Sequence, residues 1–310
     1  MINQLPIARY RLEFIVRQPI SLPEYAGSTL RGIFGHALRH LACVTRNKDC
    51  TGCLLATTCA YPLVFKPKKT ESGSIRLVTP PALYVIEPPM WGATHYKTDE
   101  RLTFHFVLLG NACKHFSLMM LAWQHAFAQS VGINAGTAKL DKVYHVTHDD
   151  AVVVYVPGDV SQSHVQHIPL VQTAPPERIT LHFKTPLRLQ ENGHAIAPNK
   201  ITARALLMAM VRRASLLSED VVGSPMFTVD QFSRLARAAE NIRIVSRQFE
   251  WRDWTRHSSR QKKSMTLGGC IGVIALEGDL QPFWSVLQLG QWLHVGKETV
   301  FGMGMYQLEP

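Results

Sequence analysis

The sequence contains one pattern twice: an alternating segment that ends at a proline, followed by an amphipathic segment. Residues 7–16 and 179–183 alternate between apolar and polar side chains, which predicts strands with one buried face. Residues 28–43 and 201–217 place apolar side chains three and four positions apart, which predicts helices. A chain of 310 residues is long enough for two domains. The repeated pattern therefore predicts two similar α+β domains in tandem.

The first half of the chain extends this pattern. Ser28 is placed to cap the first helix, and residues 102–109, 117–129 and 140–148 read as strand, helix and strand. The segment 43–96 is rich in Cys, Pro and Gly and reads as an insertion. The order is compatible with a ferredoxin-like βαββαβ unit, provided that one strand lies inside or beside the insertion.

A polar, proline-bearing stretch over 157–176 reads as a linker between domains. We therefore expect an N-terminal domain over 1–156, which carries the insertion, and a C-terminal domain over 177–310. The fold class expected is α+β, with two tandem ferredoxin-like domains.

The charge of the chain favours a polyanionic partner. It has 33 Lys and Arg against 23 Asp and Glu, a formal charge of +10. Neutralising phosphates releases counterions, which is the main source of non-specific affinity for nucleic acid. No apolar run is long enough for a membrane helix, and the N-terminus does not resemble a signal peptide. We therefore expect a cytoplasmic protein without a membrane partner, whose six cysteines are thiols or metal ligands.

The C-terminal tail is glycine-rich. Gly296, Gly302 and Gly304 bracket a polar segment that carries Lys297. Glycine lets backbone N–H groups approach phosphate closely, so Gly296, Lys297, Gly302 and Gly304 are candidates for contacting phosphate. The order of residues is not that of a Walker A loop. The alternative is a hairpin with glycines at its tight turns.

This tail, with a predicted helix at 282–292 before it, resembles the glycine-rich loop of the RAMP superfamily. Three further stretches agree: GSTLRGIFGHALR over 27–39, RHSSRQ over 256–261 and LGGCIG over 267–272. Within that superfamily the chain resembles the CRISPR-associated endoribonucleases of the Cas6 family. The four stretches bracket nearly the whole chain.

The resemblance implies an enzyme that binds CRISPR repeat RNA against the glycine loop and a basic face. It implies cleavage on the 3′ side of a stem by the 2′-hydroxyl, without a metal, to leave a 5′-hydroxyl and a 2′,3′-cyclic phosphate. Other Cas proteins of an effector complex are the further partners that it implies.

Family members often place a catalytic histidine on or just after the first helix, where this sequence has His36 and His40. On a helical wheel His40 lies at the edge of the apolar face, and His36 lies further toward the polar side. His36 is therefore the favoured acid or base, because imidazole exchanges protons near neutral pH. Arg39 is a candidate for stabilising developing charge, Tyr25 for orienting the site, and Arg31 for binding RNA.

The densest basic stretch lies between residues 243 and 263, with Trp251 and Trp254 among its charges. Cations beside aromatic rings are typical of a surface that binds RNA. The alternative is a solvated helix face with its tryptophans in the core. The residues predicted to bind RNA here are Arg243, Arg247, Arg252, Arg256, Arg260, Lys262 and Lys263.

Four cysteines, Cys43, Cys50, Cys53 and Cys59, lie within the insertion as C-x6-C-x2-C-x5-C. Four thiolates complete a tetrahedral site, so the spacing predicts a structural zinc ion. An iron–sulfur cluster and unmetallated thiols are the alternatives. Cys113 and Cys270 stand alone and read as core residues.

Three functions remain open on the sequence. The first is the endoribonuclease, and the second is a non-catalytic RAMP subunit that binds crRNA within an effector complex. The third is a zinc-stabilised nucleic-acid-binding module unrelated to CRISPR, against which the paired domains argue. His36 on a polar flank is the feature that separates the first two.

Overall fold

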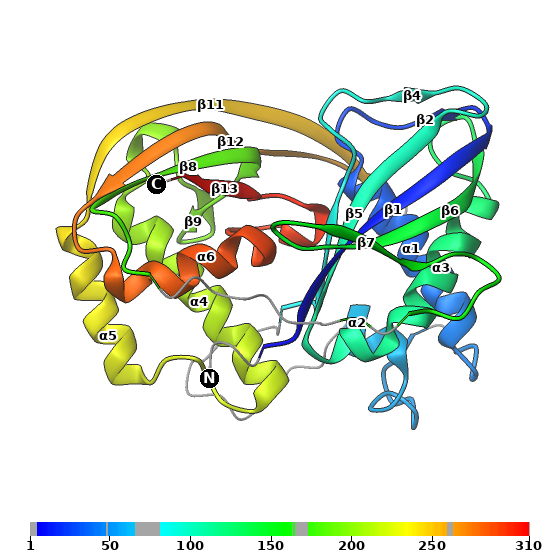
Figure 1. Cartoon of the computed structure of the whole chain (residues 1–310), viewed down its shortest axis with the longest axis horizontal. Coiled ribbons are helices and arrows are strands. Elements are labelled where there is room, and N and C mark those ends of the chain that lie inside the picture. Colours follow the sequence, from blue (N-terminus) through cyan, green and yellow to red (C-terminus); the bar gives the residue numbers. More distant parts are fainter. Residues whose placement is uncertain are drawn as a thin grey trace. The chain divides into compact units, whose positions relative to one another are not determined.

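The computed structural model of the chain describes residues 5–47, 49–65, 81–162, 164, 173–258 and 263–309 (Figure 1). The chain divides into two compact units between residues 168 and 169. This boundary falls inside the predicted linker 157–176, part of which lies outside the described residues. Within the described ranges, no helix is both long and apolar enough to cross a bilayer.

The N-terminal unit is built on a five-stranded antiparallel sheet in the order β3-β5-β1-β6-β7. Without the added β7, this is the strand order of a ferredoxin-like βαββαβ unit. The strand that had to be found within the insertion is β3. The elements are β1 (Ile7–Gln18), β2 (Ile20–Ser21), α1 (Gly27–Ala42), α2 (Ala60–Phe65), β3 (Tyr84–Glu87), β4 (His95–Tyr96), β5 (Arg101–Leu109), α3 (Phe116–Ala128), β6 (Thr137–Val146) and β7 (Ala151–Tyr155).

Helices α1 and α3 pack together over this sheet through aromatic side chains. Phe34 of α1 stacks on Trp123 of α3 at 4.7 Å between ring centroids, and Trp123 meets Phe104 of β5 edge-on at 4.7 Å. Aromatic pairs of this kind each add roughly 0.5–1.5 kcal/mol beyond the burial of their area. These contacts pack the two helices side by side, which fixes the positions of their outer side chains relative to one another.

The start of α1 differs in detail from the prediction. The helix spans Gly27–Ala42, close to the predicted range, but its N-cap is Ala26 and no side chain caps it. Ser28 lies inside the first turn, so the prediction of a Ser28 cap is wrong. The backbone alone closes the turn, where the N–H of Leu30 donates to the carbonyl of Ala26 at 2.9 Å.

The polar side of β1 carries a network of buried charges. Glu87 of β3 pairs with Arg9 at 2.6 Å, and Glu13 pairs with Arg11 at 3.1 Å and with Arg101. Buried carboxylates need such partners because an unpaired charge is costly to remove from water. Burial, with the nearby charge of Arg9, lowers the pKa of His105 to about 4 despite the neighbouring Glu87.

The C-terminal unit repeats the same plan. Its four-stranded antiparallel sheet has the order β11-β12-β8-β13, which is again the order of a ferredoxin-like unit. The prediction of two ferredoxin-like domains is therefore confirmed. The elements are β8 (Arg178–Leu187), β9 (Gln190–Glu191), β10 (His194–Ala195), α4 (Ala203–Val222), α5 (Val229–Ala238), β11 (Arg243–Ser258), β12 (Lys263–Glu277), α6 (Trp284–Leu293) and β13 (Tyr306–Glu309).

Helix α5 was not predicted, although the sequence carries its start signal. The Thr228 hydroxyl accepts from the N–H of Gln231 at 3.2 Å, and the Gln231 side chain accepts from the N–H of Thr228 at 2.9 Å. This reciprocal pair is a capping box.

The glycine-rich loop between α6 and β13 folds onto the end of β8. The N–H of Lys297 donates to the carbonyl of Arg188, and the N–H of Gly304 donates to that of Pro186, both at 2.9 Å. Gly304 has a φ of +74°, and a Cβ at this position would overlap the carbonyl oxygen of Val295. Glycine is thus required there both by conformation and by space.

We predict that Gly304→Ala destabilises the protein much more than Gly193→Ala. Both glycines have positive φ, but a Cβ on Gly193 would meet open space. Gly193→Ala should cost about 1–2 kcal/mol for its left-handed backbone alone. Gly304→Ala should add roughly 1–3 kcal/mol of overpacking. Calorimetric unfolding of the two variants measures this difference, and equal shifts would show that the loop is not packed as described.

Candidate active site and nucleic-acid interface

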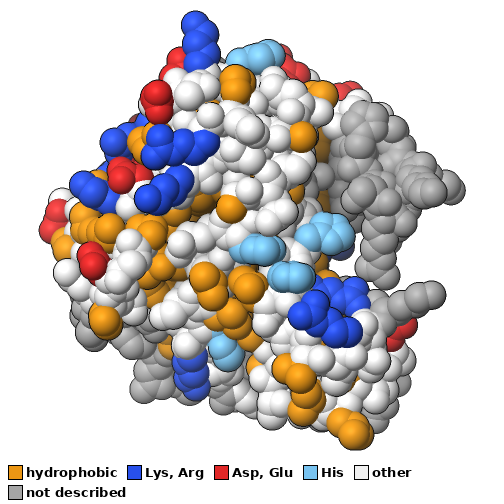
Figure 2. Space-filling view, turned by 90° about the vertical axis from the view of Figure 1, so that its right-hand side faces the viewer, with side chains coloured by type: hydrophobic (Ala, Val, Ile, Leu, Met, Phe, Trp, Pro, Cys, Tyr) orange, Lys and Arg blue, Asp and Glu red, His pale blue; other side chains and the backbone are white. Residues whose placement is uncertain are grey.

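Three histidines lie on α1 and α3, and we call them the histidine cluster: His36, His40 and His125. His36 and His40 lie one turn apart on α1, and both side chains are exposed. The ring of His40 stacks on that of His125 of α3, with centroids 4.9 Å apart and an angle of 4° between the planes. On the side of the molecule that carries α3, Figure 2 shows histidine side chains gathered near Lys and Arg side chains.

The cluster has the chemistry of a proton-transfer site. Imidazole exchanges protons near neutral pH, so one ring is suited to accept a proton and another to donate one. The sequence singled out His36 and His40, and the structure places both at the surface. It did not single out His125, because only the packing of α3 against α1 brings this residue to His40.

The other residues predicted around α1 have partners within the protein. Tyr25 is buried, at 3% exposure, with its ring 5.1 Å from that of Trp91. The guanidinium of Arg31 lies over the ring of Phe65 at 4.3 Å. The predicted roles of Tyr25 in orienting the site and of Arg31 in binding RNA stay predictions, and packing is what the described contacts show.

Arg39 is tied to the loop that follows α1. Its guanidinium donates to the carbonyl of Asn47 and lies 5.9 Å from the ring centre of Tyr61. Its predicted role in stabilising charge on RNA stays a prediction. Its observed contacts connect the last turns of α1 to the cysteine-rich loop.

The glycine-rich loop uses much of its backbone internally. Gly302 and Gly304 are buried, and their N–H groups donate to the carbonyls of Thr299 and Pro186. These two amides are therefore occupied within the protein, and the predicted RNA contact of Gly302 and Gly304 stays a prediction. Lys297 is exposed and projects from the same loop, next to the half-buried Gly296. Of the four residues predicted there, Lys297 has the side chain best suited to meet RNA.

The basic stretch forms the hairpin of β11 and β12, so the alternative of a solvated helix face is wrong. Strand alternation divides its arginines between two faces. Arg247 pairs in register with the buried Ile274 and donates to the carbonyl of Pro198 at 2.9 Å. Arg252 has the opposite parity and lies 3.5 Å from Glu250.

Some of the remaining predicted residues of the hairpin have described side chains, and others do not. Arg243 is exposed and pairs with Glu277. Trp254 is buried, at 6% exposure, while the indole N–H of Trp251 donates to Asp253 at 2.8 Å. Arg260 and Lys262 lie outside the described residues, as do the side chains of Arg256 and Lys263.

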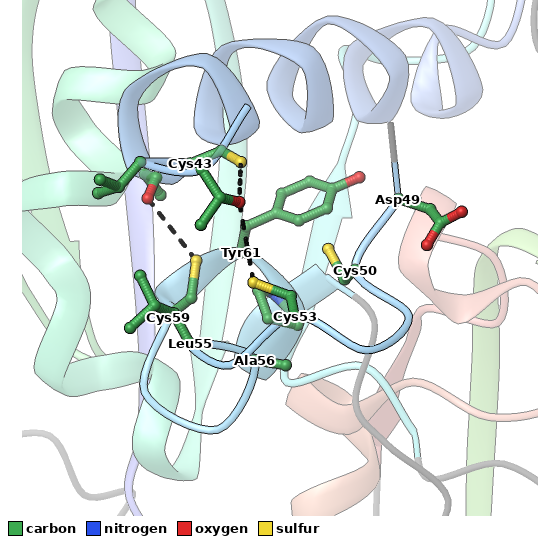
Figure 3. A pocket seen from close by; sticks show the side chains of 12 residues that line it. Cys43, Asp49, Cys50, Cys53, Leu55, Ala56, Cys59 and Tyr61 are labelled. Carbon is green, nitrogen blue, oxygen red and sulfur yellow. Dashed lines mark hydrogen bonds between the residues drawn. The ribbon is translucent and has the colours of Figure 1, made fainter. Parts of the chain in front are cut away.

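The four cysteines of the insertion line one small cavity of about 20 Å³ (Figure 3). The Sγ atoms of Cys43 and Cys53 each lie 3.8 Å from the hydroxyl of Thr45. The Sγ of Cys59 lies 3.7 Å from the carbonyl oxygen of Ala42. With side chains in these orientations, no group of three or more His, Cys, Asp or Glu within the described ranges is arranged to hold a metal ion. The zinc site stays a prediction.

The environment of Cys43 favours a thiolate. Desolvation by itself would raise the pKa of this thiol, but hydrogen bonds with Thr45 and the backbone of Arg46, together with the charge of Arg39, lower the pKa overall. Cys113 and Cys270 differ. Both are buried core residues, and burial raises the pKa of Cys113 to about 12.

Two family models match the chain one after the other. A model described as an N-terminal domain matches residues 5–169, and the model of the CRISPR-associated endoribonuclease Cas6 matches residues 181–306. No curated protein matches the sequence of this chain.

Solved structures share the fold along the whole chain. A partial Cas6-RT-Cas1–Cas2 complex matches with a TM-score of 0.61 and 13% identity, over 100% of this chain and 47% of the other. This chain thus spans less than half the length of that protein. Thermus thermophilus Cas6 matches with a TM-score of 0.55 and 15% identity, over 98% and 99% of the two chains. A RAMP protein that binds different RNA substrates matches with a TM-score of 0.50 and 11% identity, over 98% and 100%.

The comparisons agree with the features from which the resemblance was inferred. The Cas6 model covers the unit that ends in the glycine-rich loop, and full-length matches are to Cas6 and RAMP structures. Residues 181–306 therefore match the CRISPR-associated endoribonuclease Cas6, and the whole chain shares the fold of solved Cas6 structures.

Proposed function

We propose that this protein is an endoribonuclease that binds CRISPR repeat RNA and cuts the precursor transcript to release mature crRNA. The observation that carries the proposal is the histidine cluster on α1 and α3: His36 and His40 are exposed one turn apart, and the ring of His40 stacks on that of the half-buried His125. The match of residues 181–306 to the Cas6 model supports it. Cas6 structures with this fold include a product complex and a substrate-mimic complex, and one is of a histidine-to-alanine mutant.

In the proposed reaction, the 2′-hydroxyl on the 5′ side of the scissile phosphate is the nucleophile. One imidazole takes the proton of this hydroxyl while the 2′-oxygen bonds to the neighbouring phosphorus. A protonated imidazole donates a proton to the departing 5′-oxygen. The products are a 2′,3′-cyclic phosphate and a 5′-hydroxyl, with no water consumed. We assign these proton transfers to His36 and His40.

We propose that the cleavage needs no metal ion. The RNA supplies its own nucleophile, so no metal-activated water is required. Positive charge near the phosphorane is a task for cationic side chains, for which Arg39 is the nearest candidate along α1. A metal on the cysteine-rich loop would then have a structural role only.

We propose that RNA is held by the exposed cations of the C-terminal unit. Lys297 of the glycine-rich loop and Arg243 of β11 are exposed, and Arg252 is a half-buried residue of the same strand. These residues belong to a chain of formal charge +10, which favours phosphate contacts throughout.

A non-catalytic RAMP subunit that holds crRNA in an effector complex is the second candidate. The two functions share the fold and the RNA, and they differ in whether the histidine cluster performs chemistry. Other Cas proteins are proposed as partners in both cases, because one solved structure with this fold is a Cas6-RT-Cas1–Cas2 complex.

The cleavage proposal is tested with purified protein and repeat RNA in EDTA. We expect cutting at one site, with cyclic phosphate ends. His36→Ala should lower the single-turnover rate by about 10²–10⁴, the usual contribution of a general acid or base. His40→Ala should also lower it. His95→Ala is the matched control, because His95 is an exposed histidine of β4 outside the cluster.

A 2′-deoxy nucleotide at the cut site should abolish cleavage while leaving binding intact. Cleavage of that RNA would exclude the 2′-hydroxyl as the nucleophile. If no repeat RNA is cut but RNA still binds tightly, the non-catalytic subunit is the correct assignment.

For RNA binding, we expect Lys297→Ala to raise the Kd. The slope of log Kd against log salt concentration should fall by about one, the value of one lost phosphate contact. Lys139→Ala, at an exposed lysine of β6 that was not predicted to bind RNA, should change neither. Fluorescence anisotropy across a salt series measures both quantities. An unchanged slope in Lys297→Ala would remove this residue from the RNA interface.

A further inference from the structure

In the loop between α1 and α2, large apolar side chains are exposed and cysteines are half-buried. Between residues 43 and 59, Ala56 is the only described residue that is buried, and the four cysteines are the only half-buried ones. All other described residues are exposed, including Leu54 at 96% and Val44 at 80%. Apolar burial therefore contributes little to holding this loop, and a different interaction has to do so.

The side chains that the loop turns inward are thiols. The four cysteines come from three places: the C-cap of α1, a turn in the middle, and the residue before α2. All four line the same cavity (Figure 3), and none forms a disulfide. A loop that half-buries four thiols while Leu54 and Val44 are exposed is not stabilised by hydrophobic contacts, and this arrangement is expected for a metal site.

The middle of the loop is shaped to present two thiols together. The N–H of Cys53 donates to the carbonyl of Cys50 at 3.3 Å, so the two residues are the ends of one tight turn. Gly52 occupies its third position with a φ of +71°, a conformation that glycine adopts without strain. A C-x2-C turn of this kind is the usual chelating half of a zinc site.

We propose that Cys43, Cys50, Cys53 and Cys59 together bind one zinc ion. All four sulfur-bearing side chains line one cavity, so a single ion between them could be reached by every thiolate. The Thr45 hydroxyl lies between the sulfurs of Cys43 and Cys53, at 3.8 Å from each. Binding requires the cysteine side chains to rotate inward and replace these contacts with Zn–S bonds of about 2.3 Å.

The bound ion would also hold the end of α1 in place. Cys43 is the C-cap of this helix, and its N–H donates to the carbonyl of Arg39 at 2.9 Å. Arg39 in turn donates to the carbonyl of Asn47 within the loop. A zinc ion on Cys43 and Cys59 therefore joins the last turn of α1 to the residue at which α2 is about to begin. This role concerns stability and does not depend on RNA cleavage.

The test is the metal content of the full-length protein purified without added chelator. Elemental analysis should find about one zinc ion per chain, and Cys50→Ser and Cys53→Ser should lose most of it. Cys113→Ala is the matched control and should keep its zinc, since Cys113 is a buried cysteine outside the loop. Cobalt exchanged into the site should show the visible bands of tetrahedral thiolate coordination.

A second measurement keeps the proposal falsifiable if the variants fold poorly. Wild-type protein treated with a strong chelator and then with zinc should lose and regain thermal stability, and the amides of Arg39 to Cys43 should exchange faster without zinc. If the protein instead contains iron and sulfide and absorbs visible light, the site holds an iron–sulfur cluster and the zinc assignment is wrong. Protein that is free of metal, takes up no zinc and is indifferent to chelator would overturn the site altogether.

Discussion

The structure depends on a central strand in each unit that is hydrogen-bonded on both sides. β1 pairs with β5 and β6 along nearly its whole length, and β8 pairs with β12 on one side and, over residues 180–183, with β13 on the other. One face of β1 is fully buried at Tyr10, Leu12 and Phe14. Because the next helix must cover this apolar face, α1 is placed directly over the sheet. Its outer surface carries His36 and His40, the residues proposed to transfer protons.

The glycine-rich loop has a structural role within the C-terminal unit. Its buried amides bind the end of β8, and the buried His294 has its Nδ1 3.1 Å from the carbonyl oxygen of Met303. The glycines are needed because the chain passes so close to Val295 and Arg188 that no Cβ fits. What the loop offers to RNA is then a rigid position for Lys297.

The cysteine-rich loop begins where α1, the helix that carries His36 and His40, ends. His36 and His40 lie before the C-cap at Cys43, and Arg39 lies between the two histidines and contacts the loop. The proposed zinc ion would stabilise the end of the helix that carries the proposed catalytic groups. Structure and proposed chemistry therefore meet in α1, although each is tested by a separate measurement.

The sequence by itself determined the repeated strand–helix order, because periods of 2 and 3.6 are local properties of the chain. It also showed the resemblance to Cas6, which the match of residues 181–306 supports, and it singled out His36, His40 and the four cysteines as candidates. It did not locate β3, whose four residues are all buried and show no alternation. Only the tertiary structure brought His125 to His40, since this contact joins helices about 85 positions apart. It also divided the arginines of β11 between two faces, because side-chain direction in a strand is fixed by its register with β12 and β8.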